Sequence, residues 1–523
     1  MAENARADLT ADARTVCDLV RTTVGPFGAN KLVLGTNGTA TTTASGSLVL
    51  DSLELDNPAV NLLKGAASDF RDAHGDGASS VVALTGALLT EADRLAELGL
   101  HPTTIERGYR EALGVAVDRL ERSARPLDEV GVDAVARTAL TATRNPNTRA
   151  QVGEYVARIA ESLADEDGFD ADRVKVLSRL GGSESETELV EGVVLDRDPV
   201  TDDMPRTLED AGVAVLSATV DVPKLGGSTG RLDVKLSISP ERFEDRAAIG
   251  DGERERFREQ LDAAVDVGCR VVVTGMAINE RVERMMANAG VLALQRVDEE
   301  DLPGVARATG ATVVPGLEQV APETLGRAAV RVTRRAGRDV TSFESVGAER
   351  EPVYTLFCRA PDSRSVEAFE RSVGSALAAV DHAYRTRTVV PGGGAAETGA
   401  TLAVREHARS VAGTEQLAIE AFGDAMATIP RALAVNAGID GWRGLVRLRV
   451  AHHEGHDAVG VDCLFGETRD VLAEDPIAEP TALKRDVWSA ATDLATHLVR
   501  VDAEVPASDL SDEETADRLG ERP

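Results

Sequence analysis

Aromatic residues are scarce in this sequence. Phenylalanine, tyrosine and tryptophan together make up 3% of the 523 residues, whereas 43% of the residues are hydrophobic. The buried cores must therefore be built mainly from alanine, valine and leucine, which suits closely packed helices and buried parallel strands. The composition is that of a globular chain rather than a disordered one, and the length predicts two to four domains.

Lysine is almost absent: it occurs only at positions 31, 64, 175, 224, 235 and 484. Arginine is abundant, yet the formal net charge is −31. Such an acidic surface repels nucleic acid and anionic membranes, so we expect neither as a partner. In ~1 M salt the Debye length falls to ~3 Å and repulsion among carboxylates is screened. The surface therefore indicates a halophilic source, with an ordinary acidic cytosolic protein as the alternative.

Cysteine and long apolar runs are also lacking. Cys17, Cys269, Cys358 and Cys463 lie far apart without C-x-x-C spacing, so we expect reduced, buried thiols. No uninterrupted apolar run approaches the ~20 residues that span a bilayer, and the N-terminus has no apolar signal segment. The sequence therefore predicts a soluble, cytoplasmic protein.

Two textures alternate along the chain. Helical periodicity extends from residue 8 to about 130, interrupted by a hairpin-like stretch at 31–50, and returns from 365 to about 501. Between about 190 and 350, short β-rich runs alternate with amphipathic helices, which indicates an inserted α/β domain. Residues 503–523 are polar and acidic without periodicity, which predicts a disordered tail.

Three segments combine glycines with features that favour an anion. Residues 24–28 read Val-Gly-Pro-Phe-Gly, and residues 75–80 read Gly-Asp-Gly-Ala-Ser-Ser at the start of an apolar helix. Residues 389–397 place three glycines directly before another helix. Free backbone N–H groups and helix N-termini attract phosphate. Taken singly, each segment is more often a capped turn or a hinge.

Together, in this order and at these distances, the three segments resemble the nucleotide-binding equatorial domain of group II chaperonins, the thermosome or TCP-1 family. The resemblance continues at 101–105, 190–196, 203–205, 436–440 and 479–480 and covers nearly the whole chain. It implies a multidomain α+β fold of three domains. These are a helical equatorial domain at 1–130 and 389–523, a small intermediate domain at 131–199 and 351–388, and an apical α/β domain at 200–350 with a helical protrusion at about 239–267.

The resemblance also implies ligands and partners. ATP and magnesium would bind in the equatorial domain, with the metal on Asp76. The nucleotide positions carried over are Gly25, Pro26, Asp76, Gly77, Ala78, Ser79, Ser80, Thr143, Gly392, Gly393 and Glu479. Unfolded proteins would bind at the tip of the protrusion through Phe243, Ala247, Ala248 and Ile249, unless these side chains pack the protrusion on itself. Homologous subunits would complete a homo- or hetero-oligomeric double ring.

Two aspartates on which hydrolysis in the family depends are serines here. Counting from Gly25, the family's Asn-Asp-Gly motif falls on residues 44–46, which puts Ser45 at the aspartate. Ser375 stands where the family has the aspartate that activates the attacking water. A serine hydroxyl cannot act as a general base near neutral pH. In addition, Thr143, with Arg144 beside it, replaces a lysine that reaches the terminal phosphate. We therefore expect slow or absent hydrolysis.

The sequence is compatible with three functions. The first is a weakly hydrolysing or non-hydrolysing chaperonin subunit that assembles with ATPase-competent paralogues. The second is a fully active ATP-dependent foldase, against which the serines argue. The third is a client-binding module without a nucleotide cycle, against which the glycine segments argue. The histidine-rich run at 452–456 lacks the H-E-x-x-H spacing, so we do not expect a metal site there.

Overall fold

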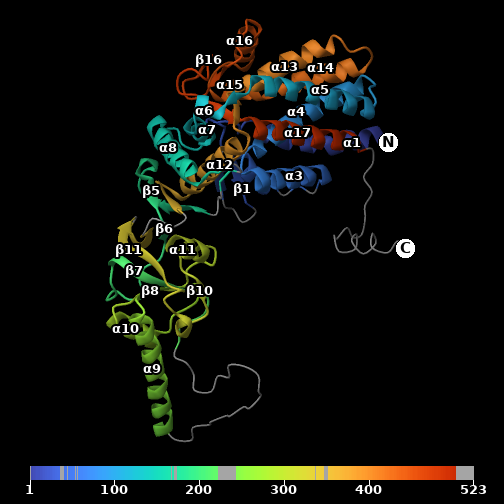
Figure 1. The fold of residues 1–523 in the computed structure, drawn as a ribbon. Helices are drawn as coiled ribbons and strands as arrows, with labels where there is room; N and C mark the ends of the chain where they lie inside the picture. The colour runs from blue at the N-terminus through green and yellow to red at the C-terminus, as the bar shows by residue number, and fades with distance from the viewer. Residues whose placement is uncertain are drawn as a thin grey trace, which may run out of the picture. The chain divides into compact units, whose positions relative to one another are not determined.

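The computed structural model describes residues 2–35, 40–43, 45–53, 55, 57–165, 168–169, 173–221, 243–335, 337–346 and 352–501. Contacts divide the chain into two compact units, Met1–Gly153 with Gly374–Pro523, and Glu154–Val373. The mixture of helices and several sheets confirms the multidomain α+β fold (Figure 1). The boundaries of three domains remain predictions, and the acidic stretch 503–523 lies outside the described residues.

The first unit is mainly helical. Its helices are α1 (Ala2–Arg21), α2 (Gly46–Asp51), α3 (Pro58–His74), α4 (Ala78–Glu97), α5 (Pro102–Ser123), α6 (Leu127–Val130), α7 (Val132–Ala139), α13 (Ala395–Ala408), α14 (Glu415–Met426), α15 (Thr428–Asn436), α16 (Gly441–His453) and α17 (Thr481–Val499). Helices α8 (Pro146–Leu163) and α12 (Ser363–Thr386) each begin in one unit and end in the other.

Short antiparallel sheets connect distant parts of the first unit. Strand β14 (Thr388–Pro391) lies between β17 (Ala478–Pro480) and β3 (Arg125–Pro126). Strands β15 (Val459–Asp462) and β16 (Glu467–Asp470) form a hairpin. Within the hairpin-like stretch predicted at 31–50, β1 (Lys31–Leu34) pairs with β2 (Ala40–Thr43), whereas residues 46–50 belong to α2.

Helix α4 lies at the centre of this unit, packed against α1, α14 and α17. Its buried face consists mainly of alanine, valine and leucine, as the composition predicts. The few aromatic residues support it from the neighbouring helices: the Tyr109 hydroxyl donates to the carbonyl of Leu88 at 2.8 Å, and the Tyr109 ring meets the Phe422 ring edge-on at 5.8 Å between centroids. This rigid helix sets the position of the loop that precedes it.

The second unit is built on sheets. The larger one has the order β6-β12-β11-β7-β8-β9, with β10 on β7, and contains β6 (Val193–Leu195), β7 (Thr207–Leu216), β8 (Cys269–Thr274), β9 (Leu292–Leu294), β10 (Val313–Val314), β11 (Gly326–Arg335) and β12 (Arg338–Ser345). A smaller sheet contains β4 (Val174–Leu180), β5 (Glu188–Glu191) and β13 (Tyr354–Ala360). In the larger sheet, helices α10 (Glu280–Asn288) and α11 (Asp301–Thr309) alternate along the chain with the parallel strands. This agrees with the predicted α/β pattern.

Helix α9 (Phe243–Asp266) occupies most of the stretch where a helical protrusion is predicted. Near its C-terminal end, Phe257, Leu261 and Ala264 are buried in the core of the larger sheet. Figure 1 shows the helix running on beyond the sheet toward its N-terminus. The side chains of the predicted client-binding residues, Phe243 and 247–249, lie outside the described residues.

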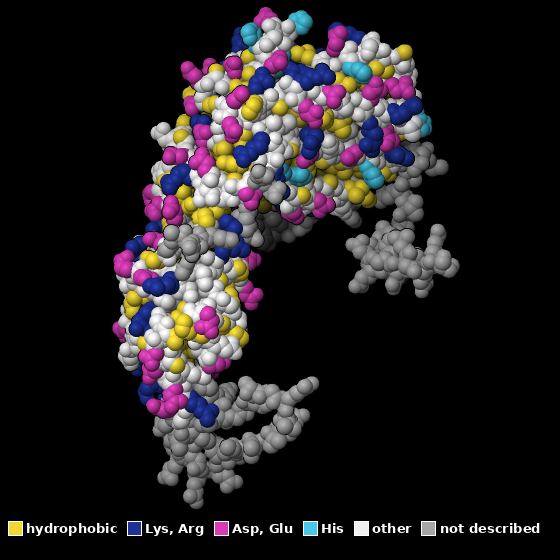
Figure 2. Space-filling model, in the orientation of Figure 1, with side chains coloured by type: hydrophobic (Ala, Val, Ile, Leu, Met, Phe, Trp, Pro, Cys, Tyr) yellow, Lys and Arg dark blue, Asp and Glu magenta, His cyan; other side chains and the backbone are white. Residues whose placement is uncertain are grey.

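Arginine is distributed over the surface in ion pairs. In the face drawn in Figure 2, basic and acidic side chains are interspersed, and typical pairs are Arg107 with Glu415 at 2.7 Å and Arg110 with Asp493 at 3.1 Å. All four cysteines are buried and free, as the sequence predicts. In the part of the chain that the structure describes, the helices are either too short or too polar to span a bilayer.

Candidate nucleotide-binding site

The first glycine segment is a tight loop that follows α1. Gly25 has φ +83°, and a Cβ atom at this position would stand 2.6 Å from Leu433 Cδ2 and 4.0 Å from Cys463 Sγ. Asn436 fastens the loop, because its Nδ2 donates to the carbonyl of Val24 at 2.7 Å. Glycine is therefore required here both by conformation and by space, and the loop backbone lies against α15 and residue 463.

The second segment joins α3 to α4. Gly75 and Gly77 both have left-handed conformations, with φ +68° and +88°. A Cβ atom on Gly77 would meet Val487 Cγ2 at 2.8 Å, so the loop backbone packs closely on α17. Gly77 is the N-cap of α4 and provides no side-chain hydrogen bond. The first N–H groups of α4 and its helix dipole are therefore available to an anion.

Ser45, the N-cap of α2, precedes a helix start that lies close to Ser79 in the first turn of α4. A Cβ atom on Gly46 would stand 2.6 Å from Ser79 Oγ and 2.9 Å from Thr23 Oγ1. Ser45 is the N-cap of α2: its Oγ accepts from the N–H of Leu48 at 3.4 Å. The position that the resemblance assigns to a metal-binding aspartate therefore lies beside the first turn of α4.

Ser375, on α12, contacts the second glycine segment. Its Oγ donates to the carbonyl oxygen of Gly75 at 3.2 Å, and a Cβ atom on Gly75 would meet Ala378 Cβ, one turn farther along α12, at 2.4 Å. The two serines at predicted catalytic positions are thus brought to the two ends of one loop. Neither side chain is a carboxylate.

The third glycine segment precedes α13. The N–H of Gly392 donates to Ile477 at 2.8 Å, and a Cβ atom on Gly393 would meet the carbonyl oxygen of Val461 at 2.4 Å. Glu479 pairs with Val390 in the adjacent strand, and its Oε1 would stand 3.2 Å from a Cβ atom on Gly392. The structure therefore places Glu479 at this loop, where the resemblance expects it.

A buried charged cluster connects the second and third segments. Lys484 Nζ lies 2.8 Å from Glu397 Oε1 and also contacts Glu479 Oε2. Burial opposes the charge of Lys484, but Glu397 and Glu479 outweigh it and raise the pKa of Lys484. Burial also raises the pKa of Glu479, with Lys484 opposing. Glu397 Oε2 is buried without a hydrogen-bond partner among the described residues.

Asp76 stands next to this cluster. Burial raises the pKa of Asp76 from 3.8 to about 6, the N–H of Gly77 opposes this shift, and the charge of Glu479 adds to it. At neutral pH the group is mostly ionised but unusually ready to accept a proton. A divalent cation would favour the ionised form.

Glu397 and Lys484 are not among the site residues predicted from the sequence. One signal was available: Lys484 is one of only six lysines in the chain, and a lysine retained in so arginine-rich a sequence suggests a specific environment. The helix pattern places residue 484 on a buried face but does not reveal which carboxylates meet it. That pairing joins residues 87 positions apart.

Thr143 is fully buried, and its hydroxyl has no hydrogen-bond partner within the described chain. Its neighbour Arg144 lies over the Phe27 ring, 5.4 Å from the ring centroid, which places the segment 143–144 at the first glycine loop. His452 in the histidine-rich run is buried, and its Nε2 donates to the carbonyl of Val459 at 2.8 Å. Within the described ranges, no group of three or more His, Cys, Asp or Glu side chains is arranged to hold a metal ion.

Comparison with known proteins identifies the family. A model of the TCP-1/cpn60 chaperonin family matches residues 16–508. The chain belongs to this chaperonin family. It is 33% identical over 522 residues to thermosome subunit alpha of Halobacterium salinarum, which covers 99% of the chain and 91% of the relative. It is 35% identical over 500 residues to thermosome subunit 3 of Haloferax volcanii, which covers 94% of each.

These relatives confirm the resemblance to group II chaperonins. A thermosome subunit of Methanopyrus kandleri is 34% identical over 507 residues. The match covers 95% of the present chain and 91% of the relative. Relatives from Halobacterium and Haloferax agree with the halophilic source that the acidic, lysine-poor composition predicts.

Replacing Asp76 by asparagine is expected to stabilise the nucleotide-free chaperonin subunit by about 1 to 3 kcal/mol at pH 7.5. The folded pKa of about 6 lies above the ordinary value of 3.8, so the folded state holds the proton more tightly than the unfolded state. The ionised carboxylate therefore costs stability above pH 6, and this cost declines as the pH falls from about 6 to about 4. Denaturation at pH 7.5 and 4.5 measures it.

The control for this variant is Asp72→Asn, on an exposed carboxylate of α3. It is expected to change stability by less than about 0.5 kcal/mol at both pH values. An Asp76→Asn variant with the same gain at pH 7.5 and 4.5, or with none, would show that Asp76 is not buried as a charge.

Proposed function

We propose that this chain is a chaperonin subunit that binds ATP and unfolded proteins within a ring but hydrolyses ATP slowly or not at all. The observation that supports this most is the contact of Ser375 Oγ with the carbonyl of Gly75. This contact brings position 375 against the loop that precedes α4, and the side chain there is a hydroxyl rather than the carboxylate that would activate water. Removing such a base typically costs ~10² to 10⁴ in rate.

The glycine loops support nucleotide binding. Gly77 and Gly394 begin α4 and α13 without a capping side chain, so two helix N-termini are open to phosphate groups. Magnesium in nucleotide sites is often held by one or two carboxylates together with the phosphates themselves. Asp76, with the hydroxyls of Ser45 and Ser79 near the same helix start, fits a weakly held magnesium ion of this kind.

Assembly with other subunits is the second part of the proposal. The relatives are named thermosome subunits, and two of them are subunit 1 and subunit 3 of a single organism, Haloferax volcanii. Several related subunits thus occur together in one species. A subunit with slow hydrolysis would then work in the cytoplasm beside ATPase-competent paralogues in a mixed double ring, while capturing clients near the N-terminal end of α9.

Titration of ATP into the purified protein, with magnesium and in molar KCl, tests the binding part. We expect saturable binding, and we expect Gly77→Ala to weaken it by about tenfold or more. The added methyl group would collide with Val487 at the start of α4 and displace the N–H groups that receive the phosphates.

Gly99→Ala is the matched control. Gly99 also has a positive φ of +88°, but a Cβ atom there would meet nothing within 4 Å. Both variants carry the same backbone strain, so only Gly77→Ala should lose ATP affinity. Absence of saturable ATP binding by the unmodified protein, or equal binding by the two variants, would contradict the proposed site.

A further inference from the structure

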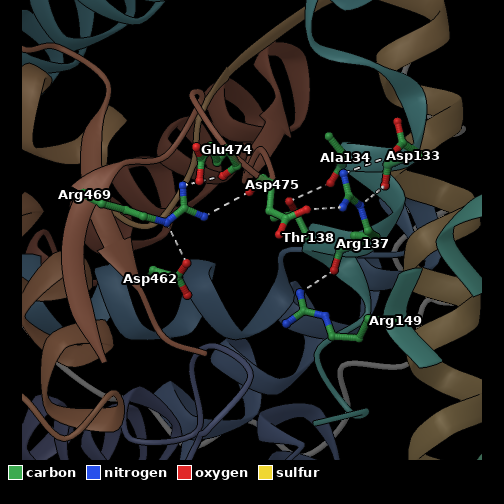
Figure 3. Close-up of polar contacts among 9 residues, drawn as sticks. All are labelled: Asp133, Ala134, Arg137, Thr138, Arg149, Asp462, Arg469, Glu474 and Asp475. Atoms are coloured by element: carbon green, nitrogen blue, oxygen red, sulfur yellow. Dashed lines mark hydrogen bonds and ion pairs between the residues drawn. The ribbon is translucent and has the colours of Figure 1, made fainter. Parts of the chain in front are cut away.

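Among the described residues, Arg149 is a buried cation without an ion-pair partner. It lies in the first turn of α8, its side chain and backbone together are 8% exposed, and one guanidinium nitrogen, Nη2, donates to the carbonyl of Arg137. The other, Nη1, is buried and has no hydrogen-bond partner among the described residues (Figure 3). Burying a guanidinium without an anion is costly, so this nitrogen is expected to have a partner in the working protein.

The aspartates drawn around Arg149 in Figure 3 pair with other arginines. Asp462 Oδ2 accepts from Arg469 Nε at 2.8 Å, and its Oδ1 accepts backbone N–H groups of residues 464 and 465. Arg137 pairs with Asp133 at 2.9 Å and with Asp475 at 3.1 Å (Figure 3). Within the described residues, Arg149 makes none of these ion pairs, and burial lowers the pKa of Arg149, with the charge of Asp462 opposing.

This guanidinium lies in the neighbourhood of the first glycine loop. Cys463 follows Asp462, and Cys463 Sγ would stand 4.0 Å from a Cβ atom on Gly25. Burial raises the pKa of the Cys463 thiol, and the positive charge of Arg149 opposes this shift. A second unpartnered polar atom, the buried hydroxyl of Thr143, belongs to the segment that contacts the loop through Arg144 and Phe27.

We propose that Arg149 binds the terminal phosphate of the nucleotide, replacing the lysine that the family has at position 143, and that it makes the site selective for a triphosphate. This inference rests on the proposed nucleotide binding. A guanidinium can donate two parallel hydrogen bonds to phosphate, which strengthens both affinity and orientation. The buried Thr143 hydroxyl, which has no partner within the described chain, would supply a further donor.

Arg144 is the competing candidate, because it is adjacent to Thr143 in the sequence. Its side chain is exposed, however, and its guanidinium already lies over the Phe27 ring. An exposed arginine is hydrated and loses little without a phosphate, whereas Arg149 has an unmet hydrogen bond in a buried place. Replacing Arg149 should therefore weaken nucleotide binding, whereas replacing Arg144 should not.

The test measures the dissociation constants of ADP and of a non-hydrolysable ATP analogue for the full chain and its variants. Arg149→Met is expected to raise the dissociation constant of the analogue by about tenfold to a hundredfold and that of ADP by less than about threefold. Arg144→Met should leave both within about twofold. Adding Thr143→Lys to Arg149→Met should restore a preference for the analogue, because the new ammonium group replaces the missing charge.

Arg149→Lys covers the case in which Arg149→Met does not fold. This variant keeps the charge but loses the paired donors. The dissociation constant of the analogue should therefore rise by about threefold to tenfold, while that of ADP stays unchanged. Equal weakening of both nucleotides, or no weakening, would overturn the role of Arg149 and leave nucleotide binding intact. If the unmodified protein binds neither nucleotide, the proposed function itself fails.

Discussion

The double variant Ser45→Asp/Ser375→Asp is expected to hydrolyse ATP about 10² to 10⁴ times faster than the unmodified protein. The two carboxylates would hold magnesium near the start of α4 and activate the attacking water, while the glycine loops and Asp76 already provide the remaining groups. Phosphate release at saturating ATP measures the gain. Each single variant should gain much less, because groups that act as a unit contribute non-additively.

Both substitutions are compatible with the local structure. Aspartate is as good an N-cap as serine, so Asp at position 45 can still accept from the N–H of Leu48. At position 375 a carboxylate can no longer donate to the carbonyl of Gly75 and would turn toward the cation. Thr143 limits the recovery, because the lysine charge at the terminal phosphate is still missing.

The control for added charge is Ser52→Asp/Ser410→Asp, which introduces two carboxylates at exposed positions of the same unit. This variant should hydrolyse ATP at the rate of the unmodified protein. If the Ser45→Asp/Ser375→Asp variant shows the same rate as this control, loss of the two aspartates is not what limits hydrolysis.

Lys484→Met is expected to lower the free energy of unfolding by about 3 to 5 kcal/mol, the range found when one partner of a buried ion pair is removed. The change leaves Glu397 and Glu479 facing each other, and Glu397 Oε2 already lacks a partner within the described chain. Urea denaturation in molar KCl, followed by the fluorescence of buried Trp488 one turn along α17, measures the loss.

Three comparisons distinguish this effect from simple loss of packing. Lys64→Met, which removes one hydrogen bond to the carbonyl of Leu53, should cost only about 0.5 to 1.5 kcal/mol. Adding Glu397→Gln to Lys484→Met should recover part of the loss, because one of the two uncompensated charges is gone. Lowering the pH should also restore part of the stability of Lys484→Met, because protonation neutralises the carboxylates. A loss as small as that of Lys64→Met would show that the cluster is not held by the lysine charge.

Local signals in the sequence predicted much of the fold. Asn57 and Pro58 indicate a helix start, and the structure has Asn57 as N-cap, with its Oδ1 accepting from the N–H of Ala59 at 2.9 Å. The second and third glycine segments also fall at helix starts, where positive φ angles and close contacts restrict positions such as Gly77 and Gly394 to glycine. Strand-forming runs between 190 and 350 form the large sheet for the same local reasons.

Tertiary relations were beyond such reasoning. The contact of Lys484 with Glu397 joins the starts of α17 and α13, and no periodicity encodes it. Arg149 reads in the sequence as an ordinary polar residue of a helix start, but packing buries its guanidinium and occupies the neighbouring carboxylates. Ser375 was placed by resemblance, whereas its hydrogen bond to Gly75 depends on how α12 packs.

The most direct test of slow hydrolysis is a single-turnover measurement on bound ATP. The purified protein is mixed with less than stoichiometric ATP labelled at the terminal phosphate, and both the bound nucleotide and the released phosphate are followed in time with magnesium present. The account predicts that ATP remains bound and uncleaved long after an ATPase-competent thermosome subunit has converted all of it. Cleavage of the bound ATP at the same rate as in that subunit would contradict the account, because it would require a base other than the missing aspartates.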